Sequence, residues 1–199
     1  MTDQPTIRPQ LHHLNLTTTR LQAMIDWYGL VLGLTPNFTF PGGAFLTNDA
    51  SNQRLALLVW SGAVADPHTQ GHTGLHHHAF EYAALADLLA AYVRLKGHGI
   101  VPAFALDHGM TVSLYYPDPD GNLLALQVDS FGDWAASTHW MQTAPAFAAN
   151  PIGTQFDPDK LVAALAAEED PATVHQRAYA GEYAPRAPGE SGPLTTFAP

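Results

Sequence analysis

The sequence predicts an α+β protein made of two paired βαβββ modules, followed by a helical C-terminal arm. Residues 11–13 and residues 75–77 both read Leu-His-His, and each segment precedes a helix-like stretch and then several strand-like ones. A tyrosine and a glycine recur at the same offset of 64 positions, as Tyr28 with Tyr92 and Gly33 with Gly97. These matches indicate an internal duplication.

The first module is expected at about residues 10–62. Alternating side chains predict a strand at residues 11–16, with His13 and Asn15 on one face. Thr19 is the expected cap of a helix whose apolar residues recur at helical spacing until Gly33. Three strands are expected at residues 37–40, 44–47 and 54–60, with Pro41-Gly42-Gly43 as the first turn.

The second module repeats this order at about residues 74–129, so the two modules together form a predicted domain at residues 8–130. We expect a strand at residues 76–82, a helix at 85–96, and strands near 100–104, 111–116 and 122–128. The segment Asp-Pro-Asp-Gly-Asn at residues 118–122 is typical of a turn. Because each module places one histidine on its opening strand, the two modules could bring His13 and His77 to a shared centre.

Residues 131–199 are predicted to form a C-terminal helical extension with a mobile tail. Residues 131–147 are rich in aromatic residues and alanine, and residues 158–169 have the pattern of a short helix. The end after Tyr183 is rich in proline and glycine, which predicts mobility. The apolar residues of the arm suggest packing on the main domain or on a second subunit, so we expect a homodimer.

Composition narrows the classes of function. Of the 199 residues, 46% are hydrophobic, and eight basic against eighteen acidic residues give a net charge of −10. The absence of a Lys/Arg cluster argues against nucleic-acid binding and favours a small-molecule partner. The N-terminal residues do not resemble a secretion signal, and no apolar run approaches the roughly 20 residues of a membrane span, so a cytoplasmic location is expected. Without cysteine, a metal would be held by histidine, carboxylate or carbonyl groups, which suits iron, manganese or zinc.

Several segments carry a family resemblance: LHHLNL, DWYGLVLGL, LHHHAFEY, DHGMTVSLYYPDPDGNLLALQVDSF and NPIGTQFDPDKL. They resemble the vicinal oxygen chelate superfamily of glyoxalases, bleomycin resistance proteins and dioxygenases, and more narrowly the single-module type I extradiol ring-cleavage dioxygenases. The resemblance implies a cup-shaped mixed sheet that holds Fe(II) on two histidines and a glutamate. It places the histidine ligands at His13 and His77, whereas the position of the glutamate is occupied by Ala125.

The resemblance also implies the reaction. A non-haem Fe(II) oxidoreductase of extradiol type would insert both atoms of O2 into a catechol and cleave the ring beside its hydroxyls. His108 would act as the acid/base group and Tyr115 would hydrogen-bond the substrate oxygens, so His108, Tyr115 and Asn15 are the expected substrate-binding residues. A site without the glutamate should bind its metal weakly or only with substrate. Gln127, two positions further along the strand, is a minor candidate for the missing ligand.

Other interpretations remain open at this point. The same fold could hold an aromatic ligand without much metal, as a resistance or sequestration protein, and Ala125 supports that alternative. A metal-dependent isomerase or lyase is a third possibility, which the missing carboxylate disfavours equally. His13 and His77 could also hydrogen-bond a ligand or each other instead of binding metal.

Overall fold

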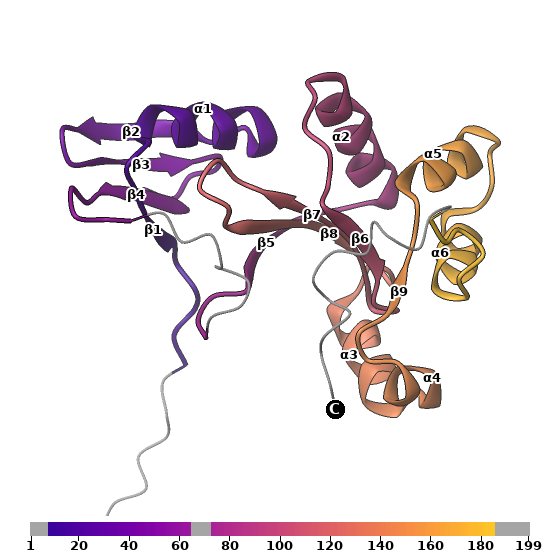
Figure 1. Ribbon diagram of the computed structural model, residues 1–199. Coiled ribbons are helices and arrows are strands. Elements are labelled where there is room, and N and C mark those ends of the chain that lie inside the picture. The colour runs from indigo at the N-terminus through magenta and orange to yellow at the C-terminus, as the bar shows by residue number, and fades with distance from the viewer. Residues whose placement is uncertain (1–7, 65–72, 186–199) are drawn as a thin grey trace, which may run out of the picture. The chain divides into compact units, whose positions relative to one another are not determined.

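The computed structural model describes residues 8–64 and 73–185 and has an α+β architecture with two mixed sheets (Figure 1). The predicted fold class is therefore confirmed. The chain divides into two compact units. Of the described residues, unit 1 comprises 8–64 together with 118–120, and unit 2 comprises 73–117 together with 121–185.

Unit 1 is a four-stranded sheet with one helix. Its strand order is β1-β4-β3-β2, and only the β1–β4 pair is parallel. Helix α1 buries Met24, Tyr28 and Val31, and alternate strand residues such as Leu55 and Leu57 complete the core. The elements are β1 (Leu14–Thr18), α1 (Leu21–Leu32), β2 (Thr35–Phe40), β3 (Gly43–Thr47) and β4 (Leu55–Val59).

Two details at the start of unit 1 differ from the sequence-based expectation. Strand β1 begins at Leu14, so His13 lies immediately before the strand and not on it. Thr19 is not the helix cap: Arg20 occupies that position, and its backbone N–H donates to the Thr18 hydroxyl at 2.9 Å. The helix does end at Gly33, which has φ 67°, a left-handed conformation that favours glycine.

Unit 2 repeats the topology and adds a strand. The order β5-β8-β7-β6-β9 matches that of unit 1, with the two-residue β9 (Thr154–Gln155) paired to the edge of β6. Helix α2 contributes buried leucines to the core on one side of this sheet. The other elements are β5 (His77–Tyr82), α2 (Leu85–Gly97), β6 (Phe104–Asp107), β7 (Thr111–Pro117) and β8 (Leu123–Asp129).

The strand expected near residues 100–104 lies at Phe104–Asp107 instead. Pro102 explains the later start, because proline has no N–H to donate to a neighbouring strand. As a result, His108 directly follows the last residue of β6.

The chain after residue 130 is largely helical. It contains α3 (Trp134–Thr143), α4 (Pro145–Ala149), α5 (Pro158–Ala166) and α6 (Pro171–Tyr179). Aspartate side chains cap α3, α5 and α6, and proline occupies the first turn of α4, α5 and α6, as is common at helix starts. Helix α6 and strand β9 were not expected from the sequence. The mobile tail was predicted after Tyr183, and its residues 186–199 lie outside the described residues.

Equivalent tyrosines anchor the helices of the two modules. The Tyr28 hydroxyl donates to the Asp118 carboxylate at 3.0 Å, and the Tyr92 hydroxyl donates to the Asp159 carboxylate at 2.9 Å. Lys96 also contacts Asp159, with its Nζ 2.6 Å from Oδ2. The duplicated tyrosines noticed in the sequence thus have the same role, although their partners come from different parts of the chain.

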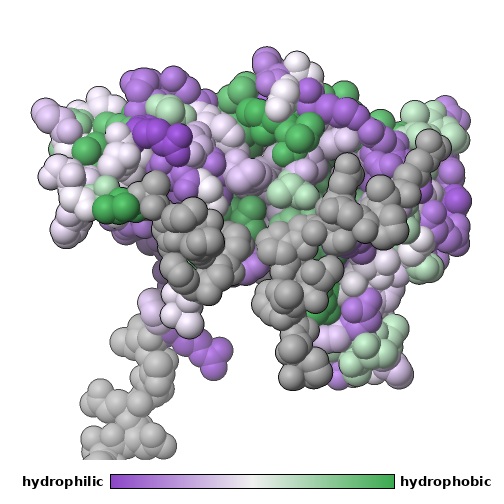
Figure 2. Space-filling model, viewed as in Figure 1, coloured by the Kyte–Doolittle hydropathy of each residue, from purple (hydrophilic) through white to green (hydrophobic). Residues whose placement is uncertain are grey.

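Hydrophilic residues and small hydrophobic patches alternate over the face shown in Figure 2. Exposed apolar side chains include Val93 on α2 and Trp134 on α3. Among the described residues, no helix combines the length and the apolar character needed to cross a membrane.

Candidate active site

One face of the sheet in unit 2 gathers most of the predicted site residues. His77 pairs with Leu123 across β5 and β8, Ala79 pairs with Ala125, and Ala125 also pairs with Tyr115 on β7. Paired residues in a sheet point to the same side, and residues two apart along a strand share a face. His77, Ala125 and Tyr115 therefore lie on a common face of three adjacent strands.

His77 is half-buried at the start of β5. Its ring stands edge-on to the ring of Tyr115, with centroids 5.2 Å apart. Its Nδ1 lies 2.8 Å from Nδ1 of His76, which leaves Nε2 for another partner. Burial, reinforced by the nearby imidazoles of His76 and His108, lowers the pKa of His77. At neutral pH this histidine is uncharged, which is the form that binds a metal.

His108 and Tyr115 form a hydrogen-bonded pair. Nε2 of His108 lies 2.8 Å from the Tyr115 hydroxyl, and the ring of Phe104 stacks on Tyr115 with centroids 4.3 Å apart. Burial lowers the pKa of His108, although a hydrogen bond to the backbone of Ile152 and the charge of Asp107 act against this effect. Burial also raises the pKa of Tyr115. The pair is therefore a neutral imidazole beside a protonated phenol, which can accept and donate protons respectively.

Ala125 has no exposed surface and packs with Phe104, Tyr115 and Leu123. Its methyl group cannot ligate a metal. No group of three or more histidine, cysteine, aspartate or glutamate side chains suited to holding a metal occurs in the described part of the chain. On this side of the sheet, Ala125 leaves His77 without a neighbouring carboxylate ligand.

Gln127 is engaged elsewhere on the same face. Its amide Nε2 donates to Oε2 of Glu81 at 3.3 Å, and the indole Nε1 of Trp134 donates to the other oxygen of Glu81 at 3.0 Å. Both contacts hold the side chains of Gln127 and Glu81 near the C-terminal ends of β8 and β5, whereas His77 lies at the start of β5. The geometry argues against Gln127 as the replacement ligand.

His13 and Asn15 belong to unit 1. Nδ1 of His13 lies 3.0 Å from Nδ1 of His12, and the two rings meet edge-on with centroids 5.2 Å apart. This arrangement repeats that of His76 and His77, whose centroids are 5.1 Å apart. Asn15 is exposed and pairs with Ala56 of β4. Unit 2 thus brings His77, His108 and Tyr115 together, and the convergence of His13 with them stays a prediction.

Comparison with known proteins identifies the family. Residues 10–126 match the model of the Glyoxalase/Bleomycin resistance protein/Dioxygenase superfamily. The chain belongs to this superfamily. The resemblance stated from the sequence motifs is therefore confirmed.

Two relatives of this superfamily member come from Rhodococcus globerulus. Biphenyl-2,3-diol 1,2-dioxygenase 2 is 38% identical over 191 residues, covering 96% of this chain and 100% of the relative. Biphenyl-2,3-diol 1,2-dioxygenase 3 is 38% identical over 175 residues, covering 88% and 92% respectively. A solved glyoxylase/bleomycin resistance protein/dioxygenase domain from Frankia sp. EAN1pec has a TM-score of 0.53 at 19% identity, over 62% of this chain and 93% of that one. The last likeness shows the shared fold.

Sequence reasoning did not anticipate that the backbone of Ile152 would act against the lowering of the His108 pKa in this superfamily member. The effect comes from the backbone, so the side chain of Ile152 gave no signal of it. The only available signal was the segment NPIGTQFDPDKL, which contains Ile152 and was recognised as part of the resemblance.

Proposed function

We propose that this protein is an extradiol-type dioxygenase that cleaves the ring of a catechol-type aromatic diol with O2. The observation that carries the proposal is the hydrogen-bonded pair of His108 and Tyr115 beside His77 on one face of the sheet. The names of the two Rhodococcus relatives support an aromatic diol as substrate, and biphenyl-2,3-diol is the first compound to test.

The chain's own residues would handle the protons of the diol. Neutral His108 would accept a proton from a substrate hydroxyl at Nε2, and the Tyr115 hydroxyl would then donate a hydrogen bond to a substrate oxygen. Phe104, stacked on Tyr115, keeps the phenol ring in place. A positioned acid/base group of this kind contributes about 10²- to 10⁴-fold in rate. Asn15 is the proposed further contact with substrate.

We propose His13 and His77 as ligands of a divalent metal, Fe(II) in the first place and Mn or Zn as alternatives. The donor set does not fit a complete site of two histidines and a carboxylate, because the third position is the buried methyl of Ala125. Changes around metal ligands alone cost about 10- to 100-fold in affinity, so the loss of an anionic ligand should cost at least as much. Weak or substrate-dependent metal binding is the expected behaviour.

A second candidate function follows from the same alanine. A protein that sequesters an aromatic compound needs the apolar face around Ala125 and Phe104 but no metal carboxylate. This alternative predicts tight binding of the compound in excess chelator, with no chemical change to it.

The deciding experiment is anaerobic loading with Fe(II), followed by addition of O2 with catechol or biphenyl-2,3-diol. The proposal predicts O2 uptake and a yellow ring-fission product. If iron analysis shows bound metal and a broad panel of catechols gives no uptake, the dioxygenase proposal fails. Calorimetric binding of the same diols in the presence of chelator would then support the sequestration alternative.

We further propose residues 8–130 as the superfamily domain, with modules at about 10–62 and 74–129, and residues 131–199 as its C-terminal extension. A cup formed by the two modules, a homodimer and a cytoplasmic location stay predictions from the sequence.

A further inference from the structure

The turn at residues 107–110, between β6 and β7, carries His108 and is closed by its own hydrogen bonds. The backbone N–H of His108 donates to the Thr111 carbonyl at 2.8 Å. The N–H of Gly109 donates to Oδ1 of Asp107, also at 2.8 Å, so the aspartate side chain folds back over the turn that follows it. Asp107 therefore links the residues before and after His108.

The side chain of Asp107 points away from the face that holds Tyr115. Its neighbour Leu106 packs in the same buried cluster as Tyr115, and successive residues of a strand point to opposite faces. Asp107 has no exposed surface, and a buried carboxylate is costly unless it is hydrogen-bonded. Its Oδ2 lies 2.8 Å from Nδ1 of His175 on α6, and because a carboxylate only accepts, Nδ1 carries the proton. The buried carboxylate thus joins the arm to the 107–110 turn.

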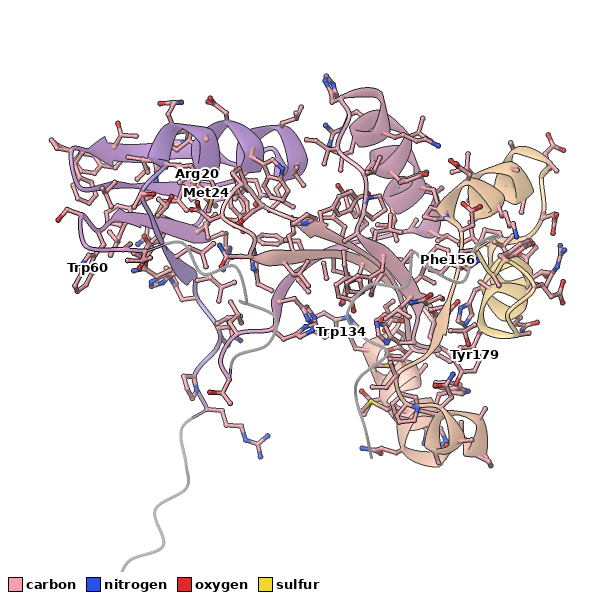
Figure 3. The ribbon with its side chains drawn as sticks, viewed as in Figure 1. Arg20, Met24, Trp60, Trp134, Phe156 and Tyr179 are labelled. Carbon is pink, nitrogen blue, oxygen red and sulfur yellow. The ribbon has the colours of Figure 1, made fainter. Side chains whose placement is uncertain are left out.

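Two aromatic residues of the arm pack directly on the same turn. Gly109 has φ +83°, and a Cβ at this position would lie 2.2 Å from Cη2 of Trp140 on α3 and 3.2 Å from Cε2 of Tyr179 on α6. Only glycine permits so close an approach. The rings of Trp140 and Tyr179, the latter labelled in Figure 3, meet edge-on with centroids 5.9 Å apart. Gly153 adds a backbone contact, since a Cβ there would lie 2.8 Å from the Cα of His108. The arm therefore holds the turn from two helices and from the segment before β9.

We infer that His175 is a positioning residue of the active site, which acts on His108 through the carboxylate of Asp107. His175 holds Asp107, Asp107 holds the N–H of Gly109, and the turn between them sets where the imidazole of His108 lies. That imidazole meets the Tyr115 hydroxyl at 2.8 Å, so a displaced turn would weaken the pair. The inference rests on the proposed function for its catalytic meaning, whereas the placement of His108 is a property of the protein without metal or substrate.

Three variants test the inference. His175→Leu removes the donor to Asp107 and keeps much of the side-chain volume. His175→Asn keeps a donor, because its amide nitrogen is separated from Cβ by one atom, as Nδ1 of histidine is. Tyr92→Phe is the matched control, because it removes a hydroxyl bond of 2.9 Å to the carboxylate of Asp159, which lies on α5 of the same arm.

The first readout is the NMR signal of the His108 ring in metal-free protein, assigned by comparison with His108→Gln. We expect the parental signal in His175→Asn and Tyr92→Phe, and a shifted or broadened signal in His175→Leu, because the bond to Tyr115 is loosened. A folded His175→Leu with the parental His108 signal would overturn the inference. So would a His108 signal that Tyr92→Phe alters as much as His175→Leu does.

A second route is available if His175→Leu does not fold, since it leaves Oδ2 of Asp107 buried without its donor. Asp107→Asn is then combined with His175→Leu. The double variant has no buried charge at this position and keeps a side-chain oxygen for the N–H of Gly109, so it removes the link to the arm alone. A parental His108 signal in the double variant would equally refute the inference.

The second readout is turnover of catechol by the Fe(II)-loaded protein. A reacting group misplaced by about 1 Å can cost about 10²-fold in rate, so His175→Leu should lower kcat by about 10- to 100-fold with little change in KM. His175→Asn should recover most of this loss, and Tyr92→Phe should keep the parental kcat. A His175→Leu protein that is less stable but keeps the parental kcat would show a purely structural role and refute the inference. If the parent itself shows no turnover, the proposed function fails, whereas the NMR measurement still tests the placement of His108.

Discussion

Ala125→Glu would restore the carboxylate that the family resemblance places among the metal ligands. The side chain of Ala125 has no exposed surface and is surrounded by Phe104, Tyr115 and Leu123. Without metal, the new carboxyl group would be buried among apolar atoms. Burial of a polar group without a partner costs about 1–3 kcal/mol in proteins, and the charged form costs more, so the pKa of the new group should rise.

With Fe(II) present, the same substitution should have the opposite effect. An anionic third ligand beside His77 should raise metal affinity by at least about 10- to 100-fold, which corresponds to about 1.4–2.7 kcal/mol. The variant should therefore unfold at a lower temperature than the parent without metal and recover part or all of this loss when iron is added. A side chain that binds the metal lowers the unfolding temperature without iron and raises it when iron is added, whereas a side chain that is only tolerated gains nothing from iron.

The assay combines anaerobic calorimetric titration with Fe(II) and thermal unfolding with and without the metal. Ala79→Glu is the matched control, because Ala79 pairs with Ala125 on the same face but is exposed. It adds the same charge without occupying the position of the missing ligand. The reasoning would be refuted if Ala125→Glu bound Fe(II) no more tightly than the parent, or if Ala79→Glu gained as much affinity.

Three further perturbations have defined outcomes. Burial, and in second place the charge of His77, lowers the pKa of His78 from 6.5 to about 4. Because the folded state favours neutral His78, its contribution to the free energy of unfolding is fully present above pH 6.5 and is lost as the pH falls toward 4. Urea unfolding should therefore give a free energy of unfolding about 3 kcal/mol lower at pH 4 than above pH 6.5, and His78→Gln should abolish this part of the pH dependence. The same pH dependence in parent and variant would show that His78 is not its source. Tyr115→Phe should lower kcat about 10²-fold while keeping the stacked ring, with some loss of stability from the missing bond to His108, and a full kcat would remove Tyr115 from the mechanism. Tyr28→Phe removes the hydroxyl that donates to buried Asp118 and should cost about 1–3 kcal/mol in urea unfolding; a loss below about 0.5 kcal/mol would show that this bond is unimportant.

The duplicated fold was predictable because local patterns and tertiary contacts agree in both modules. Apolar spacing in α1 predicted a helix that ends at Gly33, and the structure buries Met24 and Tyr28 of this pattern and places Gly33 in the left-handed region. Strand β9 was not predictable, since a two-residue strand has no periodicity of its own and exists only through pairing with β6. Helix α6 is short and amphipathic, and it depends on its contacts with the rest of the arm.

The candidate site, like the fold, could be predicted from the sequence only in part. The family resemblance predicted His77, His108 and Tyr115 as residues of one site, and the register of β5, β8 and β7 places His77 and Tyr115 on a common face. The closeness of residues 150–153 to His108 could not be predicted, because these distant parts of the sequence meet only through the pairing of β9 with β6. Side-chain identity gives no indication of contacts that the backbone makes.

The two copies of the module protect their outer strands in different ways. In unit 2 the chain covers β6 with β9, whereas in unit 1 the sheet ends, within the described residues, at β2. A bare outer strand can recruit a strand from another molecule and start aggregation. Strand β2 carries Pro36, which cannot donate a ladder bond, and its pairing is irregular between Pro36 and Phe38. Removal of the arm would uncover β6 with no such safeguard, so a shortened chain should self-associate through that strand.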